Sequence, residues 1–151
     1  MKLKINQKAP EFTLKNDLGD VFSQENLTGK VTVLFFYPKN FTPGCTKQAC
    51  TFRDSYHIFE ELGCQVLGIS SDDTTSHQAF QSKYKLPFKT FPDPNNSMRK
   101  KFGVPRDLFG LIPGRVSYIF DRQGICRGVF NAQINTKGHI EFALKKAKEL
   151  I

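Results

Sequence analysis

The chain has few cysteines, no long apolar run and little acidic charge, and each shortage excludes a class of protein. Four cysteines among 151 residues are too few for a disulfide scaffold, so we expect thiols of a reducing compartment, where paired cysteines serve catalysis or metal binding. The longest apolar runs, such as "VLFFY", are short, and the N-terminal "MKLKINQKAPEF" lacks the apolar stretch of a signal peptide. The sequence therefore predicts no export signal, no membrane contact and a cytoplasmic location.

The length and the lack of any linker predict a single domain over residues 1–151, because a chain of this size buries roughly 68–70% of its unfolded surface. The net charge is +8. Much of the excess lies between Lys83 and Arg106, which would suit phosphate or an acidic protein partner. Since no zinc-finger spacing, aromatic RNA-binding motif or recognition helix accompanies it, we expect a solvated surface and no nucleic acid.

Apolar runs alternate with helical patterns along the chain. Strands are predicted over 30–37 and 64–70, and the helical pattern between them, 43–62, is closed by Gly63. The remaining patterns predict an N-terminal hairpin over 11–22, helices over 74–84, 96–102 and 136–150, and a hairpin over 116–130 that turns at 122–124. This order of elements is typical of a thioredoxin-like α/β fold, with a central mixed sheet flanked by helices.

The segment "FFYPKNFTPGCTKQAC" (35–50) contains the most informative cysteine. Thr42 followed by Pro43 is typical of a helix start, with the threonine as an N-cap that accepts a hydrogen bond. Cys45 then falls in the first turn, where unpaired N–H groups and the helix dipole favour a thiolate. The preceding strand brings it to the sheet edge where catalytic groups of α/β folds gather, so we favour a functional thiol over a small buried side chain.

Cys50 lies five residues beyond Cys45. In an intact helix their Cα atoms would be about 8.6 Å apart, beyond the roughly 7 Å limit for a disulfide. Either Cys50 is structural, or the first turns of this helix unwind during a catalytic cycle. Zinc is a third alternative, which we disfavour because His57 and Cys64 are awkwardly placed as further ligands. We expect no metal and no cofactor.

This segment resembles the active-site motif of the peroxiredoxins. Pro38, Thr42 and Cys45 stand in a P-x-x-x-T-x-x-C arrangement, and Cys50 is similar to the resolving cysteine of the bacterioferritin comigratory protein or PrxQ subgroup. The resemblance covers essentially the whole chain, with "GISSDD", "FPDPN" and "IPGRVSYIFDRQG" in the expected order. One departure is Gln48, where many relatives carry an acidic residue, so this chain has no carboxylate at that position.

The resemblance implies a thioredoxin-dependent peroxidase that reduces hydrogen peroxide and organic hydroperoxides in antioxidant defence. Cys45 would be the peroxidatic nucleophile and form a sulfenic acid, which Cys50 would resolve as an intramolecular disulfide. Thioredoxin or another dithiol donor would then reduce that disulfide. Thr42 and Arg115 would complete the peroxide site, and Pro38 would shield it. The subgroup further implies a monomer, and a plastid stroma if the source is a photosynthetic eukaryote.

Other functions predict features that can be checked. A thiol–disulfide oxidoreductase on the same fold would carry C-x-x-C at the helix start, which this chain lacks. A basic nucleic-acid-binding module would bind duplex DNA in a salt-dependent way, and a metal carrier would retain stoichiometric zinc. Cys64 and Cys126 match no catalytic position of the peroxiredoxins, and we interpret both as structural or incidental.

Overall fold

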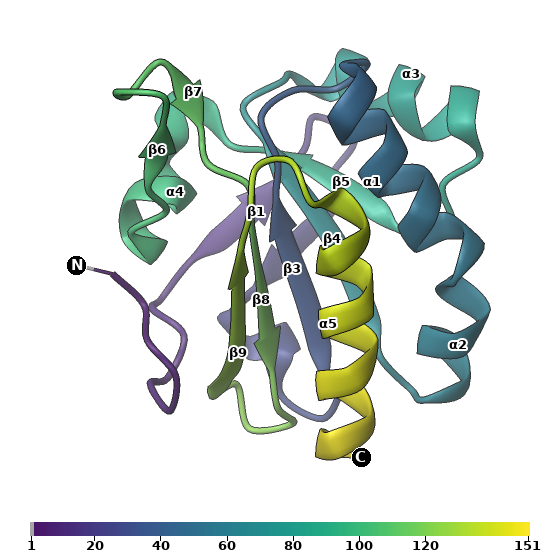
Figure 1. Cartoon of the computed structure of the whole chain (residues 1–151), viewed down its shortest axis with the longest axis vertical. Coiled ribbons are helices and arrows are strands. Elements are labelled where there is room, and N and C mark those ends of the chain that lie inside the picture. Colours follow the sequence, from purple (N-terminus) through teal and green to yellow (C-terminus); the bar gives the residue numbers. More distant parts are fainter. Residues whose placement is uncertain (1) are drawn as a thin grey trace.

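A five-stranded mixed sheet forms the centre of the fold in a computed structural model that describes residues 2–151 (Figure 1). Its strand order is β5-β4-β3-β8-β9. The three parallel strands are β3 (Thr32–Phe36), β4 (Gln65–Ser70) and β5 (Lys89–Pro92). β8 (Val116–Phe120) runs antiparallel to β3, and β9 (Cys126–Asn131) runs antiparallel to β8. The thioredoxin-like sheet predicted from the sequence is thereby confirmed.

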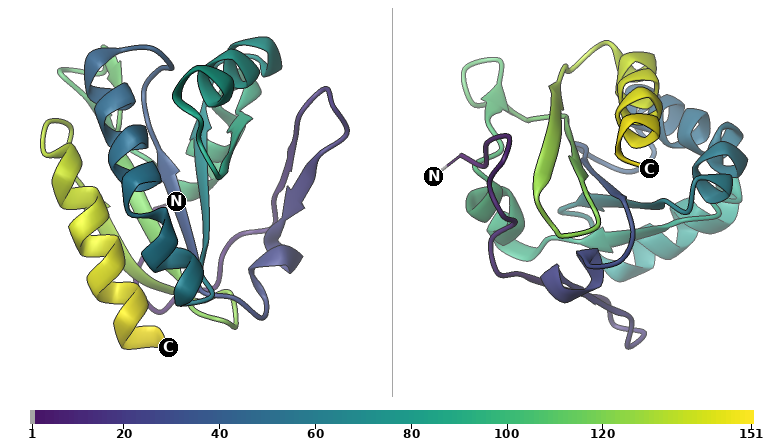
Figure 2. Two further views of the ribbon diagram at one scale, coloured as in Figure 1. Left: turned by 90° about the vertical axis from the view of Figure 1, so that its right-hand side faces the viewer. Right: turned by 90° about the horizontal axis from the view of Figure 1, so that it is seen from below.

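Helices cover both faces of this sheet. The larger group consists of α1 (Pro43–Asp54), α2 (Tyr56–Glu61), α3 (Thr74–Tyr84) and α5 (Thr136–Leu150), which share one apolar cluster with the sheet. The opposite face is covered by α4 (Ser97–Phe102) and by the N-terminal hairpin of β1 (Thr13–Lys15) and β2 (Val21–Ser23). Figure 2 shows α1 and α5 on one side of the sheet and the N-terminal hairpin on the other.

Short elements complete the chain. They are the 3₁₀ turns η1 (Gln24–Leu27) and η2 (Pro94–Asn96) and the small hairpin formed by β6 (Arg106–Asp107) and β7 (Ile112–Pro113). The β6–β7 hairpin leads directly into β8, beyond the carboxyl end of β3 (Figure 1).

The central strand β3 explains why both faces need a cover. All five of its residues are buried, and alternate side chains point to opposite faces of a strand. Leu34 and Phe36 therefore join the apolar cluster under the N-terminal hairpin, whereas Val33 and Phe35 join the cluster under α1 and α5. A continuous apolar run of this kind is typical of a strand that is buried on both faces.

The predicted helices over 74–84 and 136–150 are confirmed, but the predicted single helix over 43–62 is wrong. The chain leaves helical geometry at Ser55 (φ −102°, ψ 1°), so that α1 and α2 are separate helices. The break reorients α2, and Phe59 packs against Phe52 with ring centroids 5.8 Å apart. Gly63 follows α2 with a φ of 72° and closes it, as predicted.

His139 joins α5 to the sheet and is fully buried. Its Nδ1 lies 2.7 Å from Ser117 Oγ on β8, and its Nε2 lies 2.7 Å from the carbonyl oxygen of Ala132. Because a carbonyl only accepts, Nε2 carries the proton, and Nδ1 accepts from the serine hydroxyl. Burial lowers the pKa of His139 from its usual 6.5 to about 4, so the neutral ring is the folded form.

We expect this histidine to make the fold less stable in mild acid. The unfolded chain binds the proton at a higher pH than the folded one, so stability is complete above about pH 6.5 and declines as the pH falls toward 4, by up to about 3 kcal/mol. Burial lowers the pKa of His77 as well, which adds a loss of the same sign. Urea unfolding at pH 7.5 and 5.0 measures the difference.

Replacing His139→Gln should weaken this pH dependence while His57→Gln, which changes an exposed histidine on α2, should preserve it. An unchanged difference between the two pH values in His139→Gln would contradict the assignment.

Candidate active site

The candidate site forms where the end of β3 meets the start of β8 and the start of α1. Phe36 pairs with Val116 in the antiparallel register, so Arg115, one residue earlier, lies beside the loop that follows β3. That loop ends at Thr42, the N-cap of α1, and Cys45 occupies the first turn of the helix. The Cys45 side chain is 1% exposed, so its sulfur sits in a largely water-free environment.

Arg115 is the cation at this sulfur. Its Nη2 donates to Cys45 Sγ at 3.3 Å, its Nη1 to Gln48 Oε1 at 2.5 Å, and its Nε to the carbonyl oxygen of Gln133 at 2.9 Å. The arginine is only 4% exposed. Three hydrogen bonds in different directions hold the guanidinium rigidly, so it offers preorganised positive charge to a thiolate or to an anion that develops beside it.

Gln48 orients this arginine without neutralising it. Its amide is fully buried, and because guanidinium only donates, the oxygen must face Arg115. The amide nitrogen Nε2 has no hydrogen-bond partner among residues 2–151. Within the same range, no ion pair joins Arg115 to a carboxylate. Among the groups that Arg115 contacts, the ionised sulfur of Cys45 is therefore the one that can carry a full negative charge.

Thr42 is the N-cap of α1 as predicted, but the predicted side-chain cap is wrong. Its hydroxyl makes no hydrogen bond to the helix and donates instead to the carbonyl oxygen of Lys39 at 2.8 Å. The lone pairs of the hydroxyl oxygen remain free to accept a hydrogen bond from a small ligand. Pro38 is half-buried and opens the same loop.

Buried hydrogen bonds fix the middle of the loop over 38–42. Asn40 is 3% exposed. Its side-chain oxygen accepts from the Tyr37 hydroxyl at 2.5 Å, and its backbone N–H donates to Asp72 Oδ2 at 2.8 Å. Phe41 adopts a φ of 64°, which costs a residue with a bulky side chain on the order of 1 kcal/mol or more. The surrounding contacts therefore hold this loop in one conformation.

Cys50 lies on α1 beyond Cys45 and is half-buried. Both thiols are free, and the helix that carries them is continuous from Pro43 to Asp54. Burial raises the pKa of the Cys50 thiol, with a smaller opposing effect from Arg53. The two cysteines therefore differ in surroundings, since Cys45 contacts a cation directly and Cys50 is a protonated thiol.

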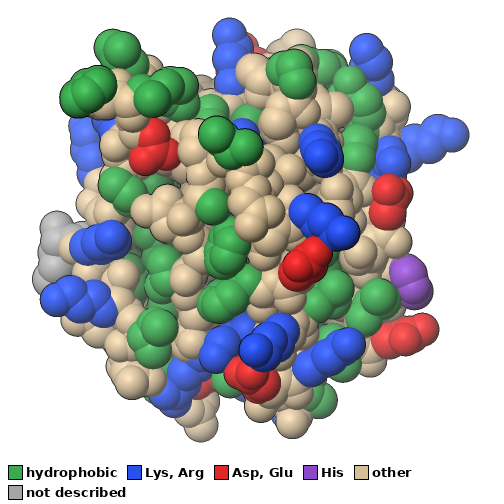
Figure 3. All heavy atoms as spheres, viewed as in Figure 1, with side chains coloured by type: hydrophobic (Ala, Val, Ile, Leu, Met, Phe, Trp, Pro, Cys, Tyr) green, Lys and Arg blue, Asp and Glu red, His purple; other side chains and the backbone are tan. Residues whose placement is uncertain are grey.

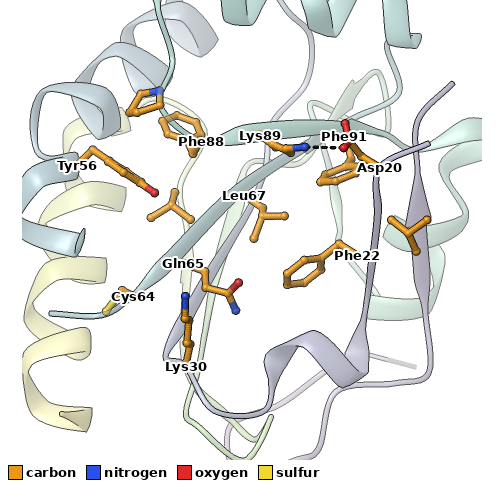
Figure 4. Close-up of a pocket in the computed structure, with 13 residues that line it drawn as sticks. Asp20, Phe22, Lys30, Tyr56, Cys64, Gln65, Leu67, Phe88, Lys89 and Phe91 are labelled. Carbon is orange, nitrogen blue, oxygen red and sulfur yellow. Dashed lines mark ion pairs between the residues drawn. The ribbon is translucent and has the colours of Figure 1, made fainter. Parts of the chain in front are cut away.

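The other two cysteines lie away from this site. Cys64 precedes β4 at the amino end of the parallel strands, where it lines a cavity of about 360 Å³ with Tyr56 and Lys30 (Figure 4). Cys126 is completely buried on β9. Burial raises the pKa of both thiols, that of Cys126 to about 11. Each is thus a protonated, enclosed thiol.

The basic stretch between Lys83 and Arg106 does not form one charged surface. Arg99 is 5% exposed and makes its hydrogen bonds inside the protein, so the expectation that it is solvated is wrong. Lys89 pairs with Asp20 at 2.6 Å. On the face shown in Figure 3, lysine and arginine side chains alternate with acidic and apolar ones. The burial of Arg99 is not readable from the sequence, because nothing in its neighbours distinguishes it from a surface arginine.

The described residues hold neither a cluster of metal ligands nor a membrane-spanning helix. Between Lys2 and Ile151, no three histidine, cysteine or acidic side chains converge so as to hold a metal ion. In the same range no helix is both long enough and apolar enough to cross a membrane.

Comparison with known proteins gives consistent matches. A model of the AhpC/TSA family matches residues 5–129. The chain is 50% identical over 147 residues to the chloroplastic peroxiredoxin Q of Arabidopsis thaliana, a match that covers 97% of this chain and 68% of that protein. It is 47% identical over 149 residues to the chloroplastic peroxiredoxin Q of Populus jackii, covering 99% and 70%.

Solved structures have the same architecture. The peroxidoxin BcpB from Mycobacterium tuberculosis superposes with a TM-score of 0.88 at 28% identity, covering 99% of both chains. The Xanthomonas campestris bacterioferritin comigratory protein, whose structure was determined as a trapped intermediate/ligand complex, superposes with a TM-score of 0.82 over 91% of this chain and 90% of that one. At 23% identity, the second match shows a common fold.

Gly44 allows Arg115 to approach Cys45, and we expect Gly44→Ala to weaken the site without weakening the fold. A Cβ at this position would lie 3.1 Å from Arg115 Nη2, so the guanidinium would have to move by a few tenths of an ångström. Alanine is the better helix former, by up to about 0.5–1 kcal/mol. Alkylation of Cys45 by iodoacetamide at pH 7 should slow roughly threefold or more, while the melting temperature stays the same or rises.

Lys47→Ala, an exposed change on the same helix, provides the control and should leave the alkylation rate unaltered. Wild-type reactivity in a well-folded Gly44→Ala would show that the position of Arg115 does not govern the Cys45 thiol.

Proposed function

The chain belongs to the AhpC/TSA family and to its peroxiredoxin Q group of thiol peroxidases, and we propose that Cys45 is its peroxidatic nucleophile. The observation that carries this proposal is the 3.3 Å hydrogen bond from Arg115 Nη2 to Cys45 Sγ in the first turn of α1. A fixed cation and the N–H groups of a helix start both favour the thiolate, which is the form of cysteine that attacks electrophiles.

The reaction that follows is a two-electron transfer from sulfur to peroxide. The thiolate attacks one peroxide oxygen, the O–O bond breaks, and the departing oxygen leaves as hydroxide or alkoxide and takes up a proton. Cys45 becomes a sulfenic acid. Because negative charge moves from the sulfur to the departing oxygen, Arg115 stabilises both ends of the step while its bonds to Gln48 and Gln133 hold it still.

Thr42 and Pro38 are the other residues that we assign to the peroxide site. The Thr42 hydroxyl already donates to the carbonyl oxygen of Lys39, so its lone pairs suit the O–H of a hydroperoxide. Pro38 has no N–H and packs half-buried at the head of the loop, where it limits the access of water to the sulfur. Asn40 supports both assignments, because its buried hydrogen bonds fix the loop that carries them.

We assign hydrogen peroxide and organic hydroperoxides as the substrates. Exposed Leu108, Phe109 and Leu111 lie on the β6–β7 hairpin, which leads directly into Arg115. Gln133 joins this hairpin to the site, since its Nε2 donates to the carbonyl oxygen of Pro113. These exposed apolar side chains, on the hairpin that precedes Arg115, support a substrate that carries an alkyl group, as an organic hydroperoxide does.

Cys50 is the resolving cysteine in this proposal. Its thiol condenses with the Cys45 sulfenic acid, which releases water and forms an intramolecular disulfide. Both residues lie on the continuous helix α1, where residues five apart are too distant to bond, so its first turns must unwind. Thioredoxin or a similar dithiol donor then reduces the disulfide by exchange, returns both thiols and becomes oxidised itself.

The proposal extends to the form of the protein. We propose a monomer with a single domain over residues 1–151 that takes part in antioxidant defence and uses no cofactor. The relatives named chloroplastic support the plastid stroma over the cytoplasm as its location.

A thioredoxin-coupled assay with hydrogen peroxide and an alkyl hydroperoxide tests the nucleophile. Cys45→Ser should abolish turnover, because serine has no accessible anion at neutral pH and no sulfur to oxidise. Cys64→Ser, a change at the enclosed thiol at the opposite, amino end of the parallel strands, should retain it. If Cys45→Ser kept more than a trace of activity, the assignment would fail.

The two cysteines should separate in a single-turnover experiment. Cys50→Ser should consume about one equivalent of peroxide and then stall as a sulfenic acid, because the Cys45 thiolate is intact but lacks its partner. Wild-type protein should form a 45–50 disulfide. Amide exchange over 43–52 should quicken on oxidation, whereas β3 and β4 stay protected.

Peptide mapping of peroxide-treated wild-type protein gives the decisive result. A bridge from Cys45 to Cys64 or Cys126, or one between two chains, would overturn the role of Cys50 and leave that of Cys45 standing.

A further inference from the structure

Arg99 is a buried arginine that reaches the active-site edge from the opposite face of the sheet. It lies on α4, which covers the face away from α1 and α5. Its Nη2 donates to the carbonyl oxygen of Tyr37 at 2.7 Å, and its Nη1 donates to the carbonyl oxygen of Gly114 at 2.7 Å. One guanidinium thus joins two backbone segments that are far apart in the sequence.

These two carbonyl groups belong to the residues that immediately precede two proposed site residues. Tyr37 is followed by Pro38, and Gly114 is followed by Arg115. Gly114 is also confined from the other side, because a Cβ there would lie 2.1 Å from the carbonyl oxygen of Pro105. The backbone before Arg115 is therefore held in position by a hydrogen bond on one side and by close packing on the other.

The backbone of Arg99 and the face of its guanidinium both have fixed neighbours. The carboxylate of Asp93 accepts hydrogen bonds from the backbone N–H of Met98 at 2.8 Å and of Arg99 at 3.1 Å, which anchors the start of α4. The guanidinium carbon lies 5.6 Å from the centre of the Phe36 ring. Its planar fork matches two carbonyl groups at once, which a lysine ammonium, as a single point of charge, does less well.

We propose that Arg99 is a positioning residue of the thiol site, which holds the backbone of Tyr37 and Gly114 so that Arg115 stays in hydrogen-bond contact with Cys45. It touches neither sulfur nor substrate in this role and acts through Arg115. The inference rests on the proposed function of Cys45, and it adds a residue to the site from the face of the sheet opposite to α1.

The charges around Arg99 are consistent with this role. Burial lowers its pKa to about 10, so it remains a cation at neutral pH. The groups whose charge acts on it are Asp93 and the Cys45 thiolate, which favour the cation, and Arg106, which opposes it. Arg99 is thus coupled electrostatically to the same sulfur whose partner it positions.

A double-mutant cycle between Arg99 and Arg115 tests the inference. Arg99→Lys keeps the charge and loses the two-carbonyl fork, so we expect alkylation of Cys45 at pH 7 and its reaction with peroxide each to slow roughly tenfold. In an Arg115→Ala background the same change should have an effect of less than about twofold, because the residue through which it acts is gone. Arg99→Gln, which also keeps a donor, serves as a second variant, and near-ultraviolet circular dichroism selects folded proteins.

Lys100→Met, an exposed change at the next residue of α4, should leave both rates as in the wild type. Wild-type rates in folded Arg99→Lys and Arg99→Gln would overturn the inference. It would also be overturned if the rate loss in the double variant equalled the product of the losses in Arg99→Lys and Arg115→Ala alone. Alkylation of Cys45 does not depend on peroxidase activity. If the wild-type chain failed to reduce peroxide, the proposed function would be refuted, but the alkylation rates would still measure the coupling of Arg99 to Cys45.

Discussion

A buried guanidinium that makes no ion pair with any carboxylate of residues 2–151 is the constraint on which the candidate-site end of this fold depends. Arg115 is almost fully enclosed, and its partners are a carbonyl oxygen, a neutral amide and a sulfur. An enclosed cation without an anion is costly, and of its three partners the sulfur of Cys45 is the one that a thiolate chemistry could use to balance the charge. Three features serve the contact between Arg115 and Cys45. They are the position of the thiol in the first turn of α1, the register that places Arg115 beside β3, and Gly44, which lets the guanidinium approach.

Helix α1 has to meet two opposite demands if Cys50 resolves the sulfenic acid. It must be intact for Cys45 to lie in its first turn beside Arg115, and it must open for the two sulfurs to meet. Its buried residues are Cys45, Gln48, Ala49 and Phe52, so one face packs and the other is solvated. The break at Ser55 limits α1 to 12 residues, and the first turns can therefore unwind while α2 stays packed through Phe59.

Local signals predicted most of the elements, and non-local contacts account for the errors. The strand over 30–37, the Thr42–Pro43 helix start and the closing Gly63 are readable because their causes lie within a few residues. The sequence did not predict strand β5, because its four residues form a strand only through their parallel pairing with β4. The burial of Arg99 could not be predicted either, since its acceptors at Tyr37 and Gly114 lie 62 and 15 residues away.

Gln48 connects the reactivity of the thiol with the opening of its helix. A carboxylate in this position would bind the Arg115 guanidinium more strongly and compete with the sulfur for its charge, whereas the amide holds the same geometry and leaves the charge to Cys45. The amide does so with a buried N–H₂ group that lacks a partner within residues 2–151, which costs about 1–3 kcal/mol. That cost falls on the closed form of α1, and the unwinding that the proposed disulfide requires would remove it by exposing the amide to water. In the proposed cycle, the side chain that leaves Arg115 free to act on Cys45 therefore also lowers the free energy needed to bring Cys50 to it.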